Sequence, residues 1–146
     1  MNILIPMAGW GSRFSQQGYD LPKPLIDVVG KPMIQRCVDS LGLSGQYIFI
    51  IRKYENHNHY LQLEEALNHL VEEPIIIEIN EVTEGAACTC MLAKEYINND
   101  MPLISANCDQ IISWDPKAFF QSLQQKNPAG CVITYDNDSI KNSYVQ

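Results

Sequence analysis

The sequence predicts an α/β protein in which a doubly wound, mostly parallel sheet lies between two layers of helices. Short apolar runs rich in Ile, Val and Leu alternate along the chain with segments whose apolar residues recur at helical spacing. Strand followed by helix, repeated in this way, is typical of a parallel sheet with right-handed crossover connections. In such a three-layer α/β/α sandwich, ligands bind in a crevice beyond the carboxyl ends of the strands.

Five apolar runs are expected to be strands that are covered on both faces, because each is short and rich in branched aliphatic residues. No internal repeat or linker divides them, so they are expected to belong to one domain. The five runs are residues 2–6, 47–51, 75–79, 102–106 and 131–135.

Four helices are expected around these strands. Apolar residues at i, i+3, i+4 and i+7 indicate a helix over residues 34–41, and a comparable stripe indicates a second over residues 60–71. A third helix should run from about residue 85 to residue 97. The fourth begins after Asp115, which supplies an N-cap acceptor ahead of Pro116 at the first helical position. Its inward face is expected to consist of Phe119, Phe120 and Leu123.

The composition is that of an ordinary globular domain. The chain has 146 residues, of which 46% are hydrophobic and 18% are charged, so it is long enough to bury its own core. Its 10 Lys and Arg against 17 Asp and Glu give a net charge of −7, which disfavours nucleic acid and anionic membrane as general partners. No apolar run has the length of a membrane span, and no basic residue precedes the first run, so we expect a soluble cytoplasmic protein.

The five cysteines are expected to be reduced and buried as small hydrophobic residues. Their number is odd, they lie mostly in apolar stretches, and they include no C-x-x-C pair. Met91 and Ala93 are expected on the same buried helix surface as two of them. The cysteines are Cys37, Cys88, Cys90, Cys108 and Cys131.

A long loop is expected after the first strand, because residues 7–29 contain three glycines and two prolines and show little periodicity. Its start, Ala8-Gly9-Trp10-Gly11-Ser12-Arg13, suits an anion, since glycine lets backbone N–H groups approach closely and Arg13 adds a charged, fork-shaped donor. Phe14 stands where the dinucleotide-binding fingerprint requires a third glycine, and the P-loop motif is missing. Trp10 is either an anchor for the loop or a stacking partner for a ligand.

Lys23 lies ten residues after Arg13, between Pro22 and Pro24. The two prolines stiffen the backbone on either side of the lysine and so restrict where its ammonium group can reach. A rigidly presented cation beside a glycine loop suits a phosphate group.

Three consecutive motifs resemble the N-terminal signature of the sugar-nucleotide pyrophosphorylases. They are Gly9-Trp10-Gly11-Ser12-Arg13, Pro22-Lys23-Pro24-Leu25-Ile26 and Val29-Gly30-Lys31-Pro32-Met33-Ile34. The resemblance continues through Thr83-Glu84-Gly85-Ala86-Ala87 and Asn107-Cys108-Asp109, so it spans nearly the whole chain. It implies a Rossmann-like nucleotidyltransferase fold and a sugar-1-phosphate nucleotidyltransferase activity.

That activity would join a nucleoside triphosphate to a sugar 1-phosphate and release pyrophosphate, as surface polysaccharide synthesis requires. The resemblance implies Arg13, Lys23 and Asp109 as catalytic residues and Asp109 as the ligand of a Mg²⁺ ion. The amide of Asn80 favours a pyrimidine base, while the base and the acceptor stay open. The implied nucleotide-binding residues are Ala8, Gly9, Gly11, Ser12, Arg13, Asn80 and Gly85.

Residues 1–146 are expected to be the nucleotide-binding N-terminal part of a nucleotidyltransferase domain, without the acceptor-binding C-terminal part. Members of the family continue with a strand that carries a Glu-Lys pair and with a second metal-binding aspartate, and neither is found before Gln146. A sheet edge exposed on a shortened domain would allow chains to pair as a homo-oligomer.

Three alternatives are weighed against this function. A cytidylyltransferase for choline phosphate or another small phosphomonoester shares the glycine loop and the lysine. A noncatalytic nucleotide-binding fragment would bind triphosphate without releasing pyrophosphate. A glycosyltransferase is less favoured, because the nearest match to its D-x-D metal motif, Asp136-Asn137-Asp138, lies in a polar tail.

Overall fold

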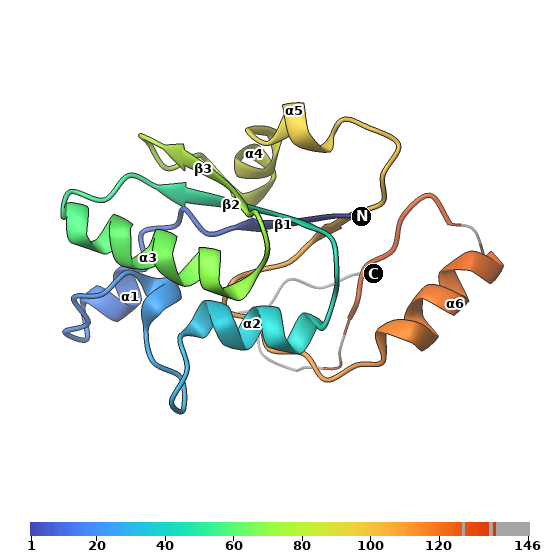
Figure 1. The fold of residues 1–146 in the computed structure, drawn as a ribbon, viewed down its shortest axis with the longest axis horizontal. Coiled ribbons are helices and arrows are strands. Elements are labelled where there is room, and N and C mark those ends of the chain that lie inside the picture. The colour runs from blue at the N-terminus through green and yellow to red at the C-terminus, as the bar shows by residue number, and fades with distance from the viewer. Residues whose placement is uncertain (127, 135, 137–146) are drawn as a thin grey trace. The chain divides into compact units, whose positions relative to one another are not determined.

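The computed structural model describes residues 1–126, 128–134 and 136, in two compact units, Met1–Trp114 and Asp115–Gln146 (Figure 1). The first unit contains a four-stranded parallel sheet in the order β3-β2-β1-β4. Its strands are β1 (Asn2–Pro6), β2 (Gln46–Arg52), β3 (Ile75–Ile79) and β4 (Leu103–Ser105). The prediction of a doubly wound parallel sheet is confirmed.

Strand β1 is one of the two internal strands of the sheet, since it pairs with a parallel strand on each side, as β2 also does. Leu4 lies opposite Ile48 of β2 and Ser105 of β4. The side chains of Ile3, Leu4 and Ile5 are fully buried, so a shift of one residue in register would exchange the residues that face the two helical layers.

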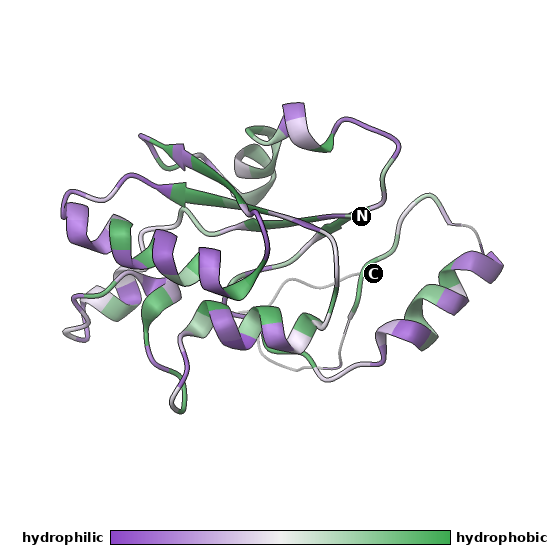
Figure 2. Cartoon of the chain, viewed as in Figure 1, coloured by the Kyte–Doolittle hydropathy of each residue, from purple (hydrophilic) through white to green (hydrophobic). Residues whose placement is uncertain are grey.

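Helices cover both faces of this sheet, as predicted (Figure 1). α2 (Met33–Leu41) and α3 (His57–Leu70) cover one face, and α4 (Ala86–Met91) and α5 (Lys94–Ile97) cover the other. Figure 2 shows strands that are hydrophobic along most of their length beside helices with mixed surfaces. The first core cluster includes Ile3, Ile5, Phe49, Cys37, Leu63 and Leu67, and the second includes Leu4, Ile48, Ile50 and Ala93.

The prediction of a fifth strand is wrong for the part of it that the structure describes. Residues 131–134 are irregular and have no ladder partner, and Val132 and Ile133 are exposed. An apolar run becomes a buried strand only when a neighbouring strand forms hydrogen bonds with its backbone and a layer of helices or another sheet covers its side chains. Tyr135, like Asn137 and Asp138 of the D-x-D match, lies outside the described residues.

Two of the four strands are less buried than predicted, because β3 and β4 form the edges of the sheet. Leu103 of β4 is 45% exposed, and Ile75, Ile76 and Ile77 of β3 are half-buried. Sequence composition alone does not distinguish such edge strands from central ones.

The predicted helices over residues 34–41 and 60–71 are confirmed as α2 and α3, whereas the predicted helix over residues 85–97 is divided into α4 and α5. The helix breaks because the amides of Leu92 and Ala93 bond the carbonyls three residues earlier, at 3.1 Å each, which tightens the chain into a turn. Ala93 at this break is fully buried against the sheet. The predicted loop over residues 7–29 is irregular except for two short turns, α1 (Ser12–Ser15) and η1 (Lys23–Leu25).

In the second unit, α6 (Pro116–Lys126) begins where predicted. The Oδ1 atom of Asp115 accepts hydrogen bonds from the amides of Lys117 at 2.9 Å and Ala118 at 3.1 Å. The residues of the predicted inward face are half-buried rather than fully buried. They are Phe119, Phe120 and Leu123. No helix in the described ranges combines the length and the apolar character that crossing a membrane requires.

The cysteines are free thiols, as predicted, but they are not all buried. Cys37 and Cys108 lie in the core and Cys90 is half-buried, whereas Cys88 and Cys131 are exposed. Met91 is also exposed, at 60%. Cys88 and Met91 are three residues apart and so share the side of α4 that faces away from the sheet, because a helix can turn only one face toward a sheet.

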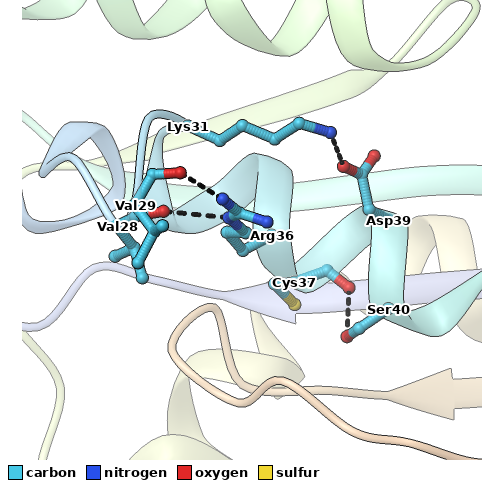
Figure 3. Close-up of polar contacts among 7 residues, drawn as sticks. All are labelled: Val28, Val29, Lys31, Arg36, Cys37, Asp39 and Ser40. Carbon is cyan, nitrogen blue, oxygen red and sulfur yellow. Dashed lines mark hydrogen bonds and ion pairs between the residues drawn. The ribbon is translucent and has the colours of Figure 1, made fainter.

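A tight turn between η1 and α2 carries an unusual backbone conformation at Val29. The φ angle of Val29 is +54°, which is strained for a β-branched residue, and its side chain is 87% exposed. Arg36 of α2 holds the turn by donating from Nε to the carbonyl of Val28 at 2.9 Å and from Nη2 to the carbonyl of Val29 (Figure 3).

Replacing Val29 with Asn should therefore raise the free energy of unfolding by about 1 kcal/mol, because Asn adopts the left-handed region at lower cost and no buried contact is lost. Urea denaturation of the variant measures the gain. Val28→Asn is the matched control, because Val28 has no positive φ and should gain nothing. Equal or lower stability of Val29→Asn would show that the turn is not strained.

Candidate active site

A cavity of about 290 Å³ opens at the carboxyl edge of the sheet. Strands β1 and β4 are adjacent and parallel, so the segments that follow them emerge at the same edge. The β1 side contributes Ala8, Gly9, Gly11 and Lys23, and the β4 side contributes Asn107, Cys108 and Asp109. The crevice expected from the fold class is therefore present, and it brings together residues from both ends of the unit.

Lys23 and Asp109 form an ion pair in this cavity. The Nζ atom of Lys23 lies 2.5 Å from Oδ2 of Asp109, and the two side chains are 24% and 41% exposed. Lys23 begins the η1 turn, in which the amide of Leu25 bonds the carbonyl of Pro22 at 2.8 Å. The predicted rigid presentation of Lys23 thus has a local basis, since η1 fixes the backbone from which the side chain extends.

Gly11 packs directly against the side chain of Lys23. Its φ angle is +64°, and a Cβ atom at this position would lie 3.2 Å from Cβ of Lys23. Both the backbone conformation and the close approach favour glycine here. The second glycine of the loop therefore positions the lysine as well as giving access to backbone amides.

Helix α2 supports the loop that carries Asp109. The thiol of Cys37 donates to the carbonyl of Asn107 at 3.2 Å, and the hydroxyl of Ser40 accepts from the amide of Ile112 at 3.3 Å. The indole of Trp114 donates to the carbonyl of Ser40 at 3.1 Å. No sequence motif indicated these contacts, because they join residues about 70 positions apart.

The two buried thiols next to the site are unsuited to nucleophilic catalysis. Burial, reinforced by Cys108 and Asp109, raises the pKa of the Cys37 thiol to about 12. Burial also raises the pKa of the Cys108 thiol to about 11, although the positive charge of Lys23 opposes this shift. Both thiols are protonated at neutral pH, and because the thiolate is the nucleophile, the cavity offers fixed charges rather than an attacking sulfur.

A third wall of the cavity comes from the segment after β3, at Val82, Thr83, Gly85 and Thr89. The hydroxyl groups of Thr83 and Thr89 are 2.5 Å apart, and Thr83 Oγ1 also donates to the carbonyl of Gly85 at 3.0 Å. Gly85 is extended, so its backbone conformation does not require glycine, and no atom would contact a Cβ there. The two threonines and Asn107 are cavity residues that the sequence-based site assignment missed, although Thr83 and Asn107 belong to motifs that carry the family resemblance.

Three of the expected site residues lie outside the cavity. Ser12 and Arg13 belong to α1 and are exposed, and Asn80 is exposed directly after β3. Lys23, Asp109, Ala8, Gly9, Gly11 and Gly85 are brought together. In the described part of the chain, no group of three or more His, Cys, Asp or Glu side chains could enclose a metal ion. Among the described residues that line the cavity, Asp109 is the one carboxylate.

The chain is similar to known nucleotidyltransferases along most of its length. A family model described as nucleotidyl transferase matches residues 3–145. The bifunctional protein GlmU of Methanococcus aeolicus is 26% identical over 147 residues, which cover 95% of this chain and 34% of that protein. The mannose-1-phosphate guanyltransferase of Yarrowia lipolytica is 29% identical over 136 residues, which cover 91% of this chain and 37% of that protein.

The crystal structure of the nucleoside-diphosphate-sugar pyrophosphorylase from Vibrio cholerae RC9 is similar with a TM-score of 0.61 and 25% identity. The match covers 81% of this chain and 52% of that one. The chain thus spans about a third of the length of the curated relatives and about half of the solved structure.

Gly11→Ala should lower the free energy of unfolding by about 1–2 kcal/mol, because the alanine would be strained at positive φ and would press on Lys23. Gly9→Ala is the matched control, since Gly9 lacks a positive φ and its Cβ would contact nothing within 4 Å. Thermal unfolding of the two variants measures the difference. Equal destabilisation by both would contradict the role assigned to Gly11.

Proposed function

Because the chain belongs to the nucleotidyl transferase family, we propose that it binds a nucleoside triphosphate and takes part in the transfer of its nucleoside monophosphate group to a sugar 1-phosphate, with release of pyrophosphate. The observation that carries this proposal is the Lys23–Asp109 pair beside the glycine loop at the carboxyl edge of the sheet. Residues 1–146 would be the nucleotide-binding part of the transferase domain. The similarity to a nucleoside-diphosphate-sugar pyrophosphorylase supports the choice of acceptor.

The proposed reaction needs positioning and charge rather than a covalent intermediate. An oxygen of the sugar 1-phosphate attacks the α-phosphorus in line and forms a new P–O bond. The bond between the α-phosphorus and the bridging oxygen breaks, and pyrophosphate leaves with the electron pair. Lys23 would hold the α-phosphate and the attacking group. The loop amides from Ala8 to Arg13 and the side chain of Arg13 would bind the β- and γ-phosphates.

The residues fit a Mg²⁺ ion that is bound chiefly by substrate phosphates. Lys23 contacts Oδ2 of Asp109, so the Oδ1 atom is left for a metal, and a hard cation with one or two protein carboxylates is the usual arrangement at such sites. When bound, the ion would neutralise the charge that develops on the phosphate oxygens. Asp109 would hold it, and Lys23 would move from Asp109 to the arriving phosphate.

Recognition of the base is assigned to the segment after β3. Gly85 lines the cavity and leaves open space where a side chain would stand, which suits a flat ring close to the backbone. Asn80 would reach the base by a movement of its exposed side chain. The pyrimidine preference, Mg²⁺ as the metal and pairing between chains stay predictions.

In a thermal-shift titration, one nucleoside triphosphate with Mg²⁺ should stabilise the chain by about 2.7 kcal/mol at a hundredfold its dissociation constant. Asp109→Asn should remove the Mg²⁺-dependent part of the shift. Asp39→Asn is the matched control, because it removes a carboxylate from another exposed ion pair, with Lys31. If Asp109→Asn behaves like the control, Asp109 is not a metal ligand.

Lys23→Ala should lower turnover by about a hundredfold or more in the whole protein, because a preorganised charge on the reacting phosphate is lost. Stability should change little, since the ion pair is partly exposed. Lys31→Ala is the matched control. Lys31 carries the same charge and forms an ion pair with Asp39 at 2.7 Å, but it does not line the cavity, so the variant should leave turnover unchanged. Pyrophosphate release assays compare the two variants, and equal rates would remove Lys23 from the mechanism.

A further inference from the structure

A second, smaller cavity of about 70 Å³ lies against the same glycine loop. Gly9, Gly11 and Lys23 line both cavities, so the loop and the lysine separate them. The second cavity is otherwise lined by different residues, among them Trp10 and Arg52. A phosphate chain held by the loop amides therefore has room on two sides of the loop.

Arg52 is the cation that strand β2 brings to the second cavity. It is the last residue of β2, two positions beyond Ile50, which pairs with Pro6 at the end of β1. The amide of Met7 bonds the carbonyl of Ile50 at 2.8 Å, so the end of β2 is tied to the start of the loop. The position of Arg52 is thus fixed by strand register and does not depend on the loop alone.

Two aromatic rings hold the guanidinium group of Arg52. Its Cζ atom lies 4.4 Å from the ring centroid of Tyr54 and 5.1 Å from that of Trp10. Tyr54 is buried, whereas Trp10 is 67% exposed. A cation–π contact holds the charge of a guanidinium group without using a hydrogen-bond acceptor, so its N–H donors can bond an anion.

These donors have no partner among the described residues, in which the Arg52 side chain makes neither a hydrogen bond nor an ion pair. Arg36 provides the contrast, because its guanidinium group donates to two backbone carbonyls and is occupied in holding a turn. Asp20 also lines the second cavity, but it is exposed and its charge is screened by water. A half-buried guanidinium group with free donors beside backbone amides suits a phosphate oxygen.

We propose that Arg52 binds the terminal phosphates of the triphosphate, and then the departing pyrophosphate, from the second cavity. The inference rests on the proposed function, and it adds a phosphate-binding residue that lies outside the glycine and lysine motifs. It also gives Trp10 a role, since Trp10 and Tyr54 present the guanidinium group. Arg52 would then contact the phosphate chain from the second cavity, while Lys23, which lines both cavities, contacts it from the first.

Isothermal titration calorimetry of the 146-residue chain with inorganic pyrophosphate and with each nucleoside triphosphate, in Mg²⁺, tests the proposal. Arg52→Gln should weaken the binding of pyrophosphate, and of the nucleoside triphosphate that the unmodified chain binds, by about tenfold or more, because charge-assisted hydrogen bonds are lost. Arg52→Lys should recover part of the loss. Lys53→Gln is the matched control, because this exposed neighbour carries the same charge and lines neither cavity. It should change the affinity less than twofold.

A Trp10→Ala variant separates direct binding from an effect on the loop. It keeps the charge of Arg52 and removes one aromatic contact, so it should weaken pyrophosphate binding by only about two- to fivefold. A loss equal to that of Arg52→Gln would overturn direct binding. Binding of nucleoside monophosphate, which lacks the terminal phosphates, should be the same in Arg52→Gln and the unmodified chain.

Pyrophosphate and nucleoside triphosphate, titrated in parallel, distinguish failure of the Arg52 phosphate site from failure of the proposed function. Triphosphate and pyrophosphate binding that Arg52→Gln leaves unchanged would overturn the role of Arg52 while the proposed function stands. Arg52-dependent binding of pyrophosphate, without binding of any triphosphate, would support the phosphate site and contradict the proposed function. Absence of pyrophosphate binding by the unmodified chain would overturn the site.

Discussion

The parallel pairing of β1 with its two neighbours is the constraint on which the rest of the structure depends. Because parallel strands end at the same edge, the loop after β1, the residues after β4 and the last residue of β2 meet there. Lys23 and Asp109, 86 positions apart, form an ion pair for this reason. Arg52 reaches the other side of the glycine loop through the same register.

Helix α2 gives this edge its rigidity. Its apolar face belongs to the core, and Cys37 and Ser40 also hold the segment around Asp109. Arg36, on the same helix, closes the strained turn at Val29. One helix of nine residues therefore stabilises the core and fixes both the loop that carries Asp109 and the turn after η1.

The electrostatics of the site follow from a few fixed groups in a chain whose net charge is −7. Lys23 and Arg52 supply local positive charge, and the buried thiols of Cys37 and Cys108 stay neutral because burial raises their pKa values. Preorganised charge without a nucleophile is what transfer between two phosphate-bearing substrates requires. A net negative chain disfavours polyanions as general partners, so the binding of an anion depends on local cations such as these.

The sequence by itself determined the α/β class, four of the five expected strands, α2, α3 and the N-cap of α6, because apolar periodicity and capping act locally. It also indicated the glycine loop, Lys23 and Asp109 through local motifs. Only the tertiary structure decided that residues 131–134 form no strand, that Cys88 and Met91 are exposed, and that Arg13 and Asn80 lie outside the cavity. Burial, ladder pairing and the meeting of Arg52 with Trp10 depend on which distant segments become neighbours, and no local pattern carries that information.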